Sequence, residues 1–448
     1  MKKTVKIHDF RHQAALSLKD ENLQKILGHT LAYSNQKRNA AVESFPNWEE
    51  MRNQAAQIRN FIISNLDIQL QKFTAQAEAN GMKVLWAEDA RQANDLILKI
   101  IKSKEAKKVV KSKSMLTEEI GLNVALEKHG LDVFETDLGE FIAQLAHQPP
   151  SHITAPIIHL SKKEAGKILC DYLQMPFTDD PAELTLMARE YLRKHFLSAQ
   201  IGITGVNFGL VDEGALVILE NEGNARLSIT LPPVHIAVMG LERLLPSAHE
   251  LPLFLNLLTV SATGQKLTNY VSVIRSARKS DEPDGVEELY LILVDNGRSR
   301  VLALKKYRQI LHCIRCGACM NVCPIYGRVG GHAYNSVYPG PLGAVLSPLL
   351  FSLPYYSQEP FASSLCGRCA EVCPVKIPLH HFLLELRADI VTARLKPTWE
   401  KYLFKMWSYL LTHHQLYRFA EKFLRILQPL FSRKGKGMFV PGWSRTRY

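Results

Sequence analysis

The chain has 448 residues, of which 46% are hydrophobic and 22% are charged, so it is a globular protein and not a disordered one. Its length favours about three domains. The net charge of +12 favours acidic partners, nucleic acid or anionic membranes, without choosing among them. No basic stripe with interleaved aromatic residues, zinc-finger pattern or recognition helix is visible, so we expect no nucleic-acid partner.

The first residues do not resemble a secretory signal, because His8, Asp9, Arg11 and His12 interrupt any apolar run. No apolar run elsewhere approaches the roughly 20 residues that a membrane-spanning helix needs. We therefore expect a cytoplasmic protein, either soluble or held peripherally at the inner face of the plasma membrane.

The first part of the chain, residues 1–65, is predicted to be helical. One continuous helical pattern covers residues 47–81 and ends at Asn80-Gly81, a good helix stop. After it, strand and helix patterns alternate: strands at 82–87, 107–114 and 131–137, and helices at 88–106 and 116–130. This β–α–β–α–β order predicts a parallel sheet covered by helices.

Further strands are predicted within residues 198–221, 225–240, 269–277 and 288–299. We therefore assign residues 66–298 to one α/β domain. Cysteine, glycine and proline become dense in residues 299–392, where helices are predicted at 301–316 and 378–395. The last part, residues 393–448, is a basic and aromatic extension.

Seven of the eight cysteines lie between residues 313 and 373. A secreted disulfide scaffold would distribute its cysteines through a short chain, whereas clustered thiols in a long chain indicate metal ligands in a reducing compartment. The first motif is Cys-x2-Cys-x2-Cys-x3-Cys-Pro and the second is Cys-x2-Cys-x3-Cys-Pro. Zinc prefers two Cys-x2-Cys pairs, so this pattern favours iron–sulfur clusters.

In two-cluster ferredoxins, the cysteine that precedes proline ligates the other cluster. The pattern therefore assigns Cys313, Cys316, Cys319 and Cys373 to 4Fe–4S cluster one, and Cys323, Cys366 and Cys369 to 4Fe–4S cluster two. Such a crossed pair of clusters suits one-electron relay.

Cluster two has only three assigned thiolates, because Ser363 aligns with Cys313. Its fourth ligand is not assigned, and the candidates are water, a substrate oxygen, a residue other than cysteine and a partner's thiolate. Ser363 fits a loop or cap role better than a ligand role. The isolated Cys170 is more typical of a small buried hydrophobic residue, and His380 and His381 of a surface or capping role.

The α/β domain shows no dinucleotide or P-loop fingerprint, and the glycines of residues 202–209 fit turns better than a nucleotide cradle. Polar clusters at 111–114, 135–140 and 220–224 follow predicted strands, where open α/β sheets bind ligands. Taken alone, each of these groups of polar residues more often belongs to the surface than to a binding site. In the tail, Trp407, Tyr409, Tyr417 and Phe423 are mixed with basic residues, and packing on protein is favoured over lying on an anionic membrane.

Six segments of the chain resemble a known family: residues 111–121, 135–145, 149–153, 214–226, 313–326 and 365–380. In this order they resemble the lactate-utilisation iron–sulfur proteins of the LutB family, over nearly the whole chain. The resemblance implies a LUD domain of the CoA-transferase-like α/β type with a parallel or mixed sheet, followed by an α-helical ferredoxin-type domain with two 4Fe–4S clusters. Similar proteins have the three-cysteine second motif, so Ser363 is not a departure.

The resemblance also implies an iron–sulfur electron-transfer subunit in a system that oxidises L-lactate to pyruvate, with LutA-like and LutC-like partners. No flavin or nicotinamide fingerprint is visible, so we expect an electron-carrier component of an L-lactate dehydrogenase complex more than its catalytic subunit. The electron acceptor is not specified. Two alternatives stay open: a hydroxy-acid-binding subunit that uses the open iron of cluster two, and a LUD-domain sensor of an anionic metabolite with redox clusters.

Overall fold

The computed structural model describes residues 8–431, so the N-terminal heptapeptide and the last residues, including the sequence GWSRTRY, lie outside the described part. The chain divides into two compact units, Met1–Arg387 and Ala388–Tyr448. Each unit is described by itself below.

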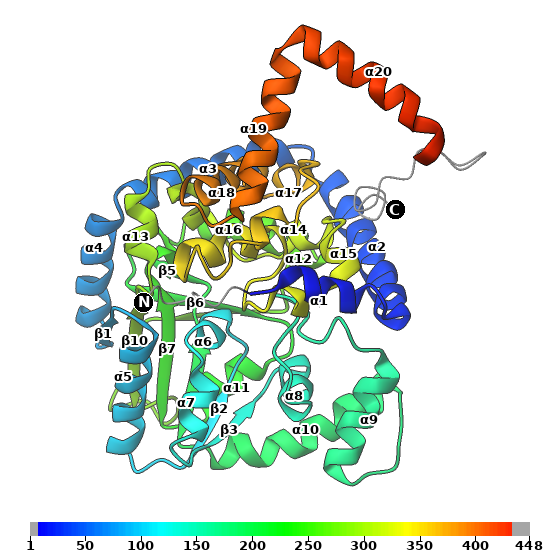
Figure 1. The fold of residues 1–448 in the computed structure, drawn as a ribbon. Coiled ribbons are helices and arrows are strands. Elements are labelled where there is room, and N and C mark those ends of the chain that lie inside the picture. Colours follow the sequence, from blue (N-terminus) through cyan, green and yellow to red (C-terminus); the bar gives the residue numbers. More distant parts are fainter. Residues whose placement is uncertain (1–7, 432–448) are drawn as a thin grey trace. The chain divides into compact units, whose positions relative to one another are not determined.

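The first unit is built on a six-stranded sheet in which every pairing is parallel. Its strands, in spatial order, are β1 (Lys83–Ala87), β10 (Glu288–Val294), β7 (Val234–Gly240), β4 (Ile201–Gly205), β2 (Lys108–Lys111) and β3 (Asp132–Glu135). The predicted parallel α/β sheet is thus confirmed (Figure 1). Since all strands run in one direction, their carboxyl ends meet at one edge.

The two central strands, β7 and β4, are buried on both faces, as strands of a covered parallel sheet are. On β7, Ile236 and Val238 pack under helices α5 (Ala90–Ser103) and α7 (Leu122–Glu127), whereas Ala237 and Met239 face the opposite core. Helix α5 buries Ala93, Ile97 and Ile101 at four-residue spacing, which places them on one helical face. A third apolar cluster joins β2 to helices α8 (Leu138–Leu145), α9 (Lys162–Leu173) and α10 (Pro181–Ser198).

Some of the further predicted strands form a second, mixed sheet, which was not predicted to be separate from the first. It contains β8 (Leu244–Leu245), β5 (Phe208–Leu210), β6 (Ala215–Glu220) and β9 (Tyr270–Ile274), in that order. Together with α4 (Leu66–Ala79) and α12 (Leu251–Thr263) it covers the other face of the parallel sheet.

The cysteine-rich part of this unit is helical. Its elements are α13 (Arg298–Ala303), the 3-10 helix η2 (Arg308–His312), α14 (Ala318–Asn321), α15 (Tyr326–Val329), the 3-10 helix η3 (His332–Tyr334), α16 (Gly340–Leu350), the 3-10 helix η4 (Glu359–Phe361) and α17 (Arg368–Glu371), followed by the start of α18 (Leu379–Thr392). The fold class is therefore an α/β domain joined to a helical region, as expected. Apolar residues of this region belong to the same core as the second sheet.

Three N-terminal helices complete the first unit: α1 (Phe10–Ser17), α2 (Glu21–Glu43) and α3 (Trp48–Ser64). Helix α2 contacts both α12 of the α/β part and α15 of the helical part. Helix α3 contacts α12 and η2 in the same way. The N-terminal segment therefore joins the two parts.

Four sequence predictions were wrong in detail. The helical pattern at 47–81 is broken at Asn65 into α3 and α4, and the helix predicted at 116–130 is broken at Gly121 into α6 (Met115–Glu119) and α7. Residues 225–230, predicted as strand, lie in helix α11 (Asn224–Thr230). Residues 301–316 form the end of α13 and η2 instead of one helix. The last three errors concern short elements, which are stabilised by tertiary packing more than by local propensity.

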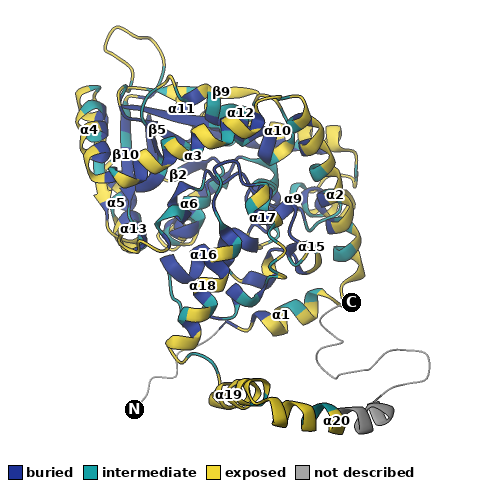
Figure 2. Cartoon of the chain, turned by 90° about the horizontal axis from the view of Figure 1, so that it is seen from above, coloured by how far each residue is buried: buried dark blue, intermediate teal, exposed yellow. Residues whose placement is uncertain are grey.

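The second unit contains α19 (Thr398–Thr412) and α20 (His414–Phe431). The aromatic side chains of Trp407, Tyr409, Tyr417 and Phe423 are exposed, and Figure 2 shows α19 and the described part of α20 as largely exposed. Among the described residues, no helix is both long and apolar enough to cross a membrane.

Candidate iron–sulfur centre and adjoining cavity

The two cysteine motifs have the same backbone. Arg315 and Leu365 both have positive φ angles, of 61° and 56°. Gly317 and Gly367, which follow the second cysteine position of the aligned motifs, have φ angles of 77° and 83° and each precedes a four-residue helix, α14 or α17. Glycine is required most clearly at residue 317, because a Cβ there would lie 3.1 Å from the His152 ring. The sequence repeat is therefore a structural repeat.

Thiols of the two motifs raise one another's pKa across the motifs. Burial raises the pKa of Cys316, and Cys373 of the second motif and then Cys313 raise it further. The pKa of Cys369 is raised to about 12 by burial, then by Cys323 of the first motif and by Cys366. The influence of Cys373 on Cys316 and of Cys323 on Cys369 agrees with the crossed ligand prediction, and Cys319 has neighbours from both predicted sets.

The donor set suits iron–sulfur clusters. All eight cysteines are free thiols, and burial together with neighbouring sulfurs disfavours bare thiolates at most of the motif positions. A cationic iron core removes this penalty by binding the sulfurs as thiolates. Within the described chain no three His, Cys, Asp or Glu side chains converge tightly enough to hold a single ion.

Backbone N–H groups donate to several of these sulfurs. Arg315 N–H donates to Cys313 Sγ at 3.4 Å, Tyr326 N–H to Cys323 Sγ at 3.5 Å, and Ile377 N–H to Cys373 Sγ at 3.3 Å. Hydrogen bonds to cluster sulfurs stabilise the reduced, more negative state and so tune the reduction potential.

Ser363 stands where the first motif has Cys313. Its Oγ accepts a hydrogen bond from the N–H of Leu365 at 3.1 Å, in the same way as Cys313 Sγ accepts from Arg315. The nearby Cys366 is exposed, whereas Cys369 is buried. The side of the second motif at Ser363 and Cys366 is therefore the more open to solvent.

Sequence reasoning missed the residues of the N-terminal helices that hold the cysteine loops. Arg59 of α3 is buried, and its guanidinium donates to the carbonyls of Leu311 (2.9 Å) and His312 (3.2 Å) before the first motif and to those of Glu242 (2.5 Å) and Leu244 (2.7 Å) in the α/β part. Arg52, one heptad earlier, donates to the carbonyls of Cys373 and Glu371. The only sequence signal was a pair of arginines at helical spacing among apolar residues.

A buried network of charges joins the α/β part to the first cysteine loop. The Arg298 guanidinium binds both oxygens of Glu119, at 2.8 and 2.9 Å, and Glu242 at 2.6 Å. Glu242 also accepts from Arg315 at 3.5 Å, and Tyr338 donates to Glu119. The two arginines and Arg243 lower the pKa of Glu242 to about 2 despite its burial, so this carboxylate is ionised.

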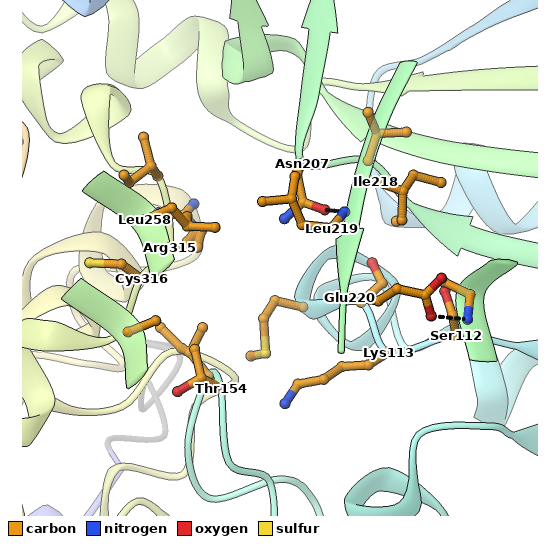
Figure 3. A pocket seen from close by; sticks show the side chains of 18 of the residues that line it. Ser112, Lys113, Thr154, Asn207, Ile218, Leu219, Glu220, Leu258, Arg315 and Cys316 are labelled. Carbon is orange, nitrogen blue, oxygen red and sulfur yellow. Dashed lines mark hydrogen bonds between the residues drawn. The ribbon is translucent and has the colours of Figure 1, made fainter. Parts of the chain in front are cut away.

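A cavity of about 310 Å³ lies between the carboxyl edge of the parallel sheet and this loop. Figure 3 shows Arg315 and Cys316 on one side of it and Asn207, Leu219 and Glu220 on the other. The volume lies within the usual range for small-molecule sites, and the carboxyl edge of an open α/β sheet is where such sites form.

Several polar positions singled out in the sequence line or adjoin this cavity. Lys111 is buried and pairs with Glu135 at 2.6 Å and Glu118 at 3.2 Å, so it is structural. Lys113, by contrast, lines the cavity, together with Glu220 and Glu222.

Other sequence candidates have packing roles. A Cβ at residue 202 would lie 1.8 Å from the Ser228 carbonyl oxygen, and one at residue 205 would lie 2.4 Å from Ser114 Oγ, so these two glycines of β4 serve close packing and not a turn. Cys170 is buried in the apolar cluster of α8, α9 and α10, as expected of a small hydrophobic residue. His380 is partly buried and His381 is exposed.

Comparison with protein families gives the same two parts. Residues 70–294 match the LUD domain and residues 309–377 match the 4Fe-4S dicluster domain. The protein is therefore a LUD-domain protein with a dicluster iron–sulfur region, and its cofactors are two 4Fe–4S clusters. The predicted boundaries at 65, 298 and 392 stay predictions.

Curated relatives make the assignment more specific. "Lactate utilization protein B" of Macrococcus caseolyticus is 45% identical, covering 98% of this chain and 93% of the relative. Proteins of the same name from Oceanobacillus iheyensis and Bacillus velezensis are also 45% identical, each over 92% of this chain and 87% of the relative. The chain belongs to the lactate utilization protein B family. A solved structure of a DUF162 family protein from Deinococcus radiodurans aligns with 51% of the chain, at 12% identity and a TM-score of 0.30.

Proposed function

We propose that this chain is the iron–sulfur electron-transfer subunit of a system that oxidises L-lactate to pyruvate. The name shared by its relatives supports a role in lactate utilization, and the dicluster region supports a role in carrying electrons. LutA-like and LutC-like subunits are the proposed partners. A cytoplasmic location, free or at the inner face of the membrane, belongs to the same proposal.

The grouping of the thiols is the observation that carries this proposal. The proposed ligands of cluster one are Cys313, Cys316, Cys319 and Cys373, and those of cluster two are Cys323, Cys366 and Cys369, as the spacing of the motifs assigns them. In this assignment the last cysteine of each motif, the one before proline, ligates the cluster of the other motif, so the two clusters are held near each other. Burial raises the pKa of the Cys319 thiol, and Cys369 is one of the neighbouring cysteines that raise it further. Because Cys319 is assigned to cluster one and Cys369 to cluster two, this proximity supports a short path between the clusters.

Each bound cluster supplies a one-electron redox site. Oxidation of lactate to pyruvate releases two electrons and two protons, so two sites in one chain match the electrons of one turnover. The chain's own contribution is to hold the sulfurs, to donate N–H hydrogen bonds to them and to exclude water with buried residues such as Ile314, Ala318 and Val375.

Mixing experiments with the purified LutA-like and LutC-like proteins test the role. We expect L-lactate to reduce the clusters of this chain, seen as bleaching of visible absorbance, only when the partners are present. Reduction by lactate without partners would show that the chain itself oxidises the substrate. No reduction with all components present, although dithionite reduces the clusters, would contradict the relay role.

The exposure of Cys366 and the serine at residue 363 favour one second candidate, in which a hydroxy acid binds the open iron of cluster two. A lactate-dependent change in the spectrum of cluster two alone, without partners, distinguishes this candidate from the relay.

A further inference from the structure

Helix α2 lies against both cysteine motifs. The side-chain amide of Asn35 donates at 2.7 Å to the carbonyl of Asn321, the last residue of α14, and the two helices are in contact. One turn further along α2, the Arg38 guanidinium donates at 3.3 Å to the carbonyl of Val372, the residue before Cys373. Residue 38 therefore stands where α14 of the first motif meets the last cysteine of the second.

Arg38 is a buried cation without a carboxylate partner. It is 8% exposed, and no carboxylate within residues 8–431 forms an ion pair with its guanidinium. Apart from the Val372 carbonyl, the guanidinium donates to the side-chain oxygen of Asn39 at 3.3 Å, and its buried Nε has no hydrogen-bond partner among the described residues. A buried charge is costly unless an opposite charge lies close to it. The guanidinium therefore needs an anion of another kind nearby.

The groups that act on this arginine identify that anion. Burial lowers the pKa of Arg38, whereas the Cys316 thiol raises it; the neighbouring Arg52 lowers it and Cys373 raises it. Reciprocally, burial and the neighbouring thiols raise the pKa of Cys316, whereas Arg38 lowers it. Cys316 and Cys373 belong to different motifs, but both are proposed ligands of cluster one. The anion next to Arg38 is therefore cluster one with its thiolates.

A second arginine reaches the same end of the second motif. Arg52 of α3 donates to the Cys373 carbonyl, at 2.8 and 3.0 Å, and lies close enough to Arg38 for their charges to repel. Arg52 has a carboxylate partner, the exposed Glu49 at 2.6 Å. Repulsion between two arginines is unfavourable unless the group beside them carries negative charge. Of the two, Arg38 is the one whose charge depends on the cluster for its balance.

The sulfurs of cluster two have different surroundings. Burial raises the pKa of Cys369, then Cys323 and Cys366 raise it further, and backbone N–H groups lower it. Burial also raises the pKa of Cys323, and backbone N–H groups again lower it. Arg38 is not among the main groups, of those described, that shift either pKa. A change of charge at residue 38 is therefore expected to act on cluster one and not on cluster two.

We propose that Arg38 raises the reduction potential of cluster one, as a positive charge held beside the cluster by α2. Reduction adds one electron, and so one negative charge, to the iron core and its thiolates, and a buried cation nearby favours that state. An arginine keeps its proton in both redox states, so Arg38 acts through its charge alone. The inference rests on the proposed relay and its ligand assignment, and it makes cluster one the better electron acceptor that the relay uses.

The test uses the anaerobically purified full chain with its clusters and the variants Arg38→Gln and Arg38→Lys. Stepwise reduction with dithionite, followed by EPR, gives the midpoint potential of each cluster, and iron content shows that both are present. Cys369→Ser replaces a proposed ligand of cluster two, so the signal that it alters or removes belongs to that cluster.

We expect Arg38→Gln to lower the equilibrium constant for reduction of cluster one about tenfold, which is about 59 mV for a one-electron couple, and to leave cluster two unchanged. Arg38→Lys keeps the charge and is expected to retain most of the original potential. A merely structural role of Arg38 would change iron content or stability in both variants without this difference between them.

Lys37→Gln is the matched control, because this exposed lysine is the neighbour of Arg38 on α2 and its substitution removes the same charge. Both midpoint potentials are expected to stay unchanged in it. Asn39→Asp leaves Arg38 in place and gives it a carboxylate at the position of its present contact, so it should lower the potential of cluster one in the same direction by a smaller amount. This variant decides the matter if Arg38→Gln does not assemble its clusters.

Three results would overturn the inference: a cluster-one potential that is unchanged in Arg38→Gln or, where that variant does not assemble, in Asn39→Asp; an equal fall in Arg38→Gln and Arg38→Lys; or an equal fall in Lys37→Gln. If dithionite still reduces both clusters in those cases, the relay proposal stands without this role for Arg38. An unmodified chain whose clusters dithionite does not reduce would contradict the relay and the inference together.

Discussion

Ser363 is the residue at which the two halves of the cluster region differ most. Ser363 and Cys313 each lie two residues before a residue with a positive φ angle, and the Ser363 oxygen accepts the same local hydrogen bond as the Cys313 sulfur. The local geometry is therefore suited to a ligand, whereas the side chain is a neutral hydroxyl that binds iron more weakly than a thiolate does. The fourth iron of cluster two is expected to be the most labile of the eight.

Ser363→Cys should remove that lability, because a thiolate at this position completes the ligand set of cluster two. On exposure to air, the unmodified chain is expected to lose about one iron and to show a three-iron EPR signal, and Ser363→Cys to retain its iron and show no such signal. Ser364→Cys adds the same thiol one residue away and should behave like the unmodified chain. Equal loss from both variants would show that residue 363 does not face the cluster.

At the level of single residues, the sequence predicted the cysteines and their repeat, because ligand spacing is local information. It could not predict Arg52 and Arg59, whose partners are backbone carbonyls more than 180 residues away. Lys111 and Lys113 were similarly indistinguishable in sequence, because only the placement of Glu135 on the neighbouring strand buries and neutralises one of them.

Among the elements, α3 has an unexpected role as a support for the cysteine loops. Its Arg59 satisfies four carbonyls, two from η2 and two from the segment that follows β7. The four residues that carry these carbonyls are themselves buried, so water is not an alternative partner for them. The helix thus fixes the start of the first cysteine loop to the α/β part.

Arg59→Lys is expected to destabilise this junction, because an ammonium group keeps the charge but cannot reach four acceptors in the geometry of a guanidinium. Leaving buried carbonyls without donors should lower the free energy of unfolding by roughly 3 kcal/mol. The midpoint of anaerobic urea unfolding measures this loss, together with iron content. Arg91→Lys on the exposed face of α5 serves as control, and an equally small effect at both positions would argue against the supporting role of Arg59.

The strands that form long apolar runs, such as β7 and β10, were predicted well because their burial on both faces is visible in composition. The short helices were not. Gly121, at φ 64°, divides a continuous helical pattern, and residues 225–230 fold as helix α11, whose first N–H groups at Ala225 and Arg226 are capped by Glu220. These outcomes depend on contacts that local patterning does not encode.

At the scale of the whole first unit, the α/β part, the N-terminal helices and the cysteine loops share one apolar core. The amino-acid composition changes sharply near residue 300, which suggested separate domains. The shared core brings the carboxyl edge of the parallel sheet against the first cysteine loop, and so creates the cavity. A site built from both parts could not be predicted from either part alone.

The most direct test of the relay is EPR on the anaerobically purified protein during a stepwise reduction, with iron and sulfide determined on the same sample. The crossed ligand assignment predicts about eight irons, about eight sulfides and two reduced signals that broaden each other through spin–spin interaction. Two independent, non-interacting signals would contradict the crossed assignment. About four irons with one signal, or no reducible signal, would contradict the two-cluster relay itself.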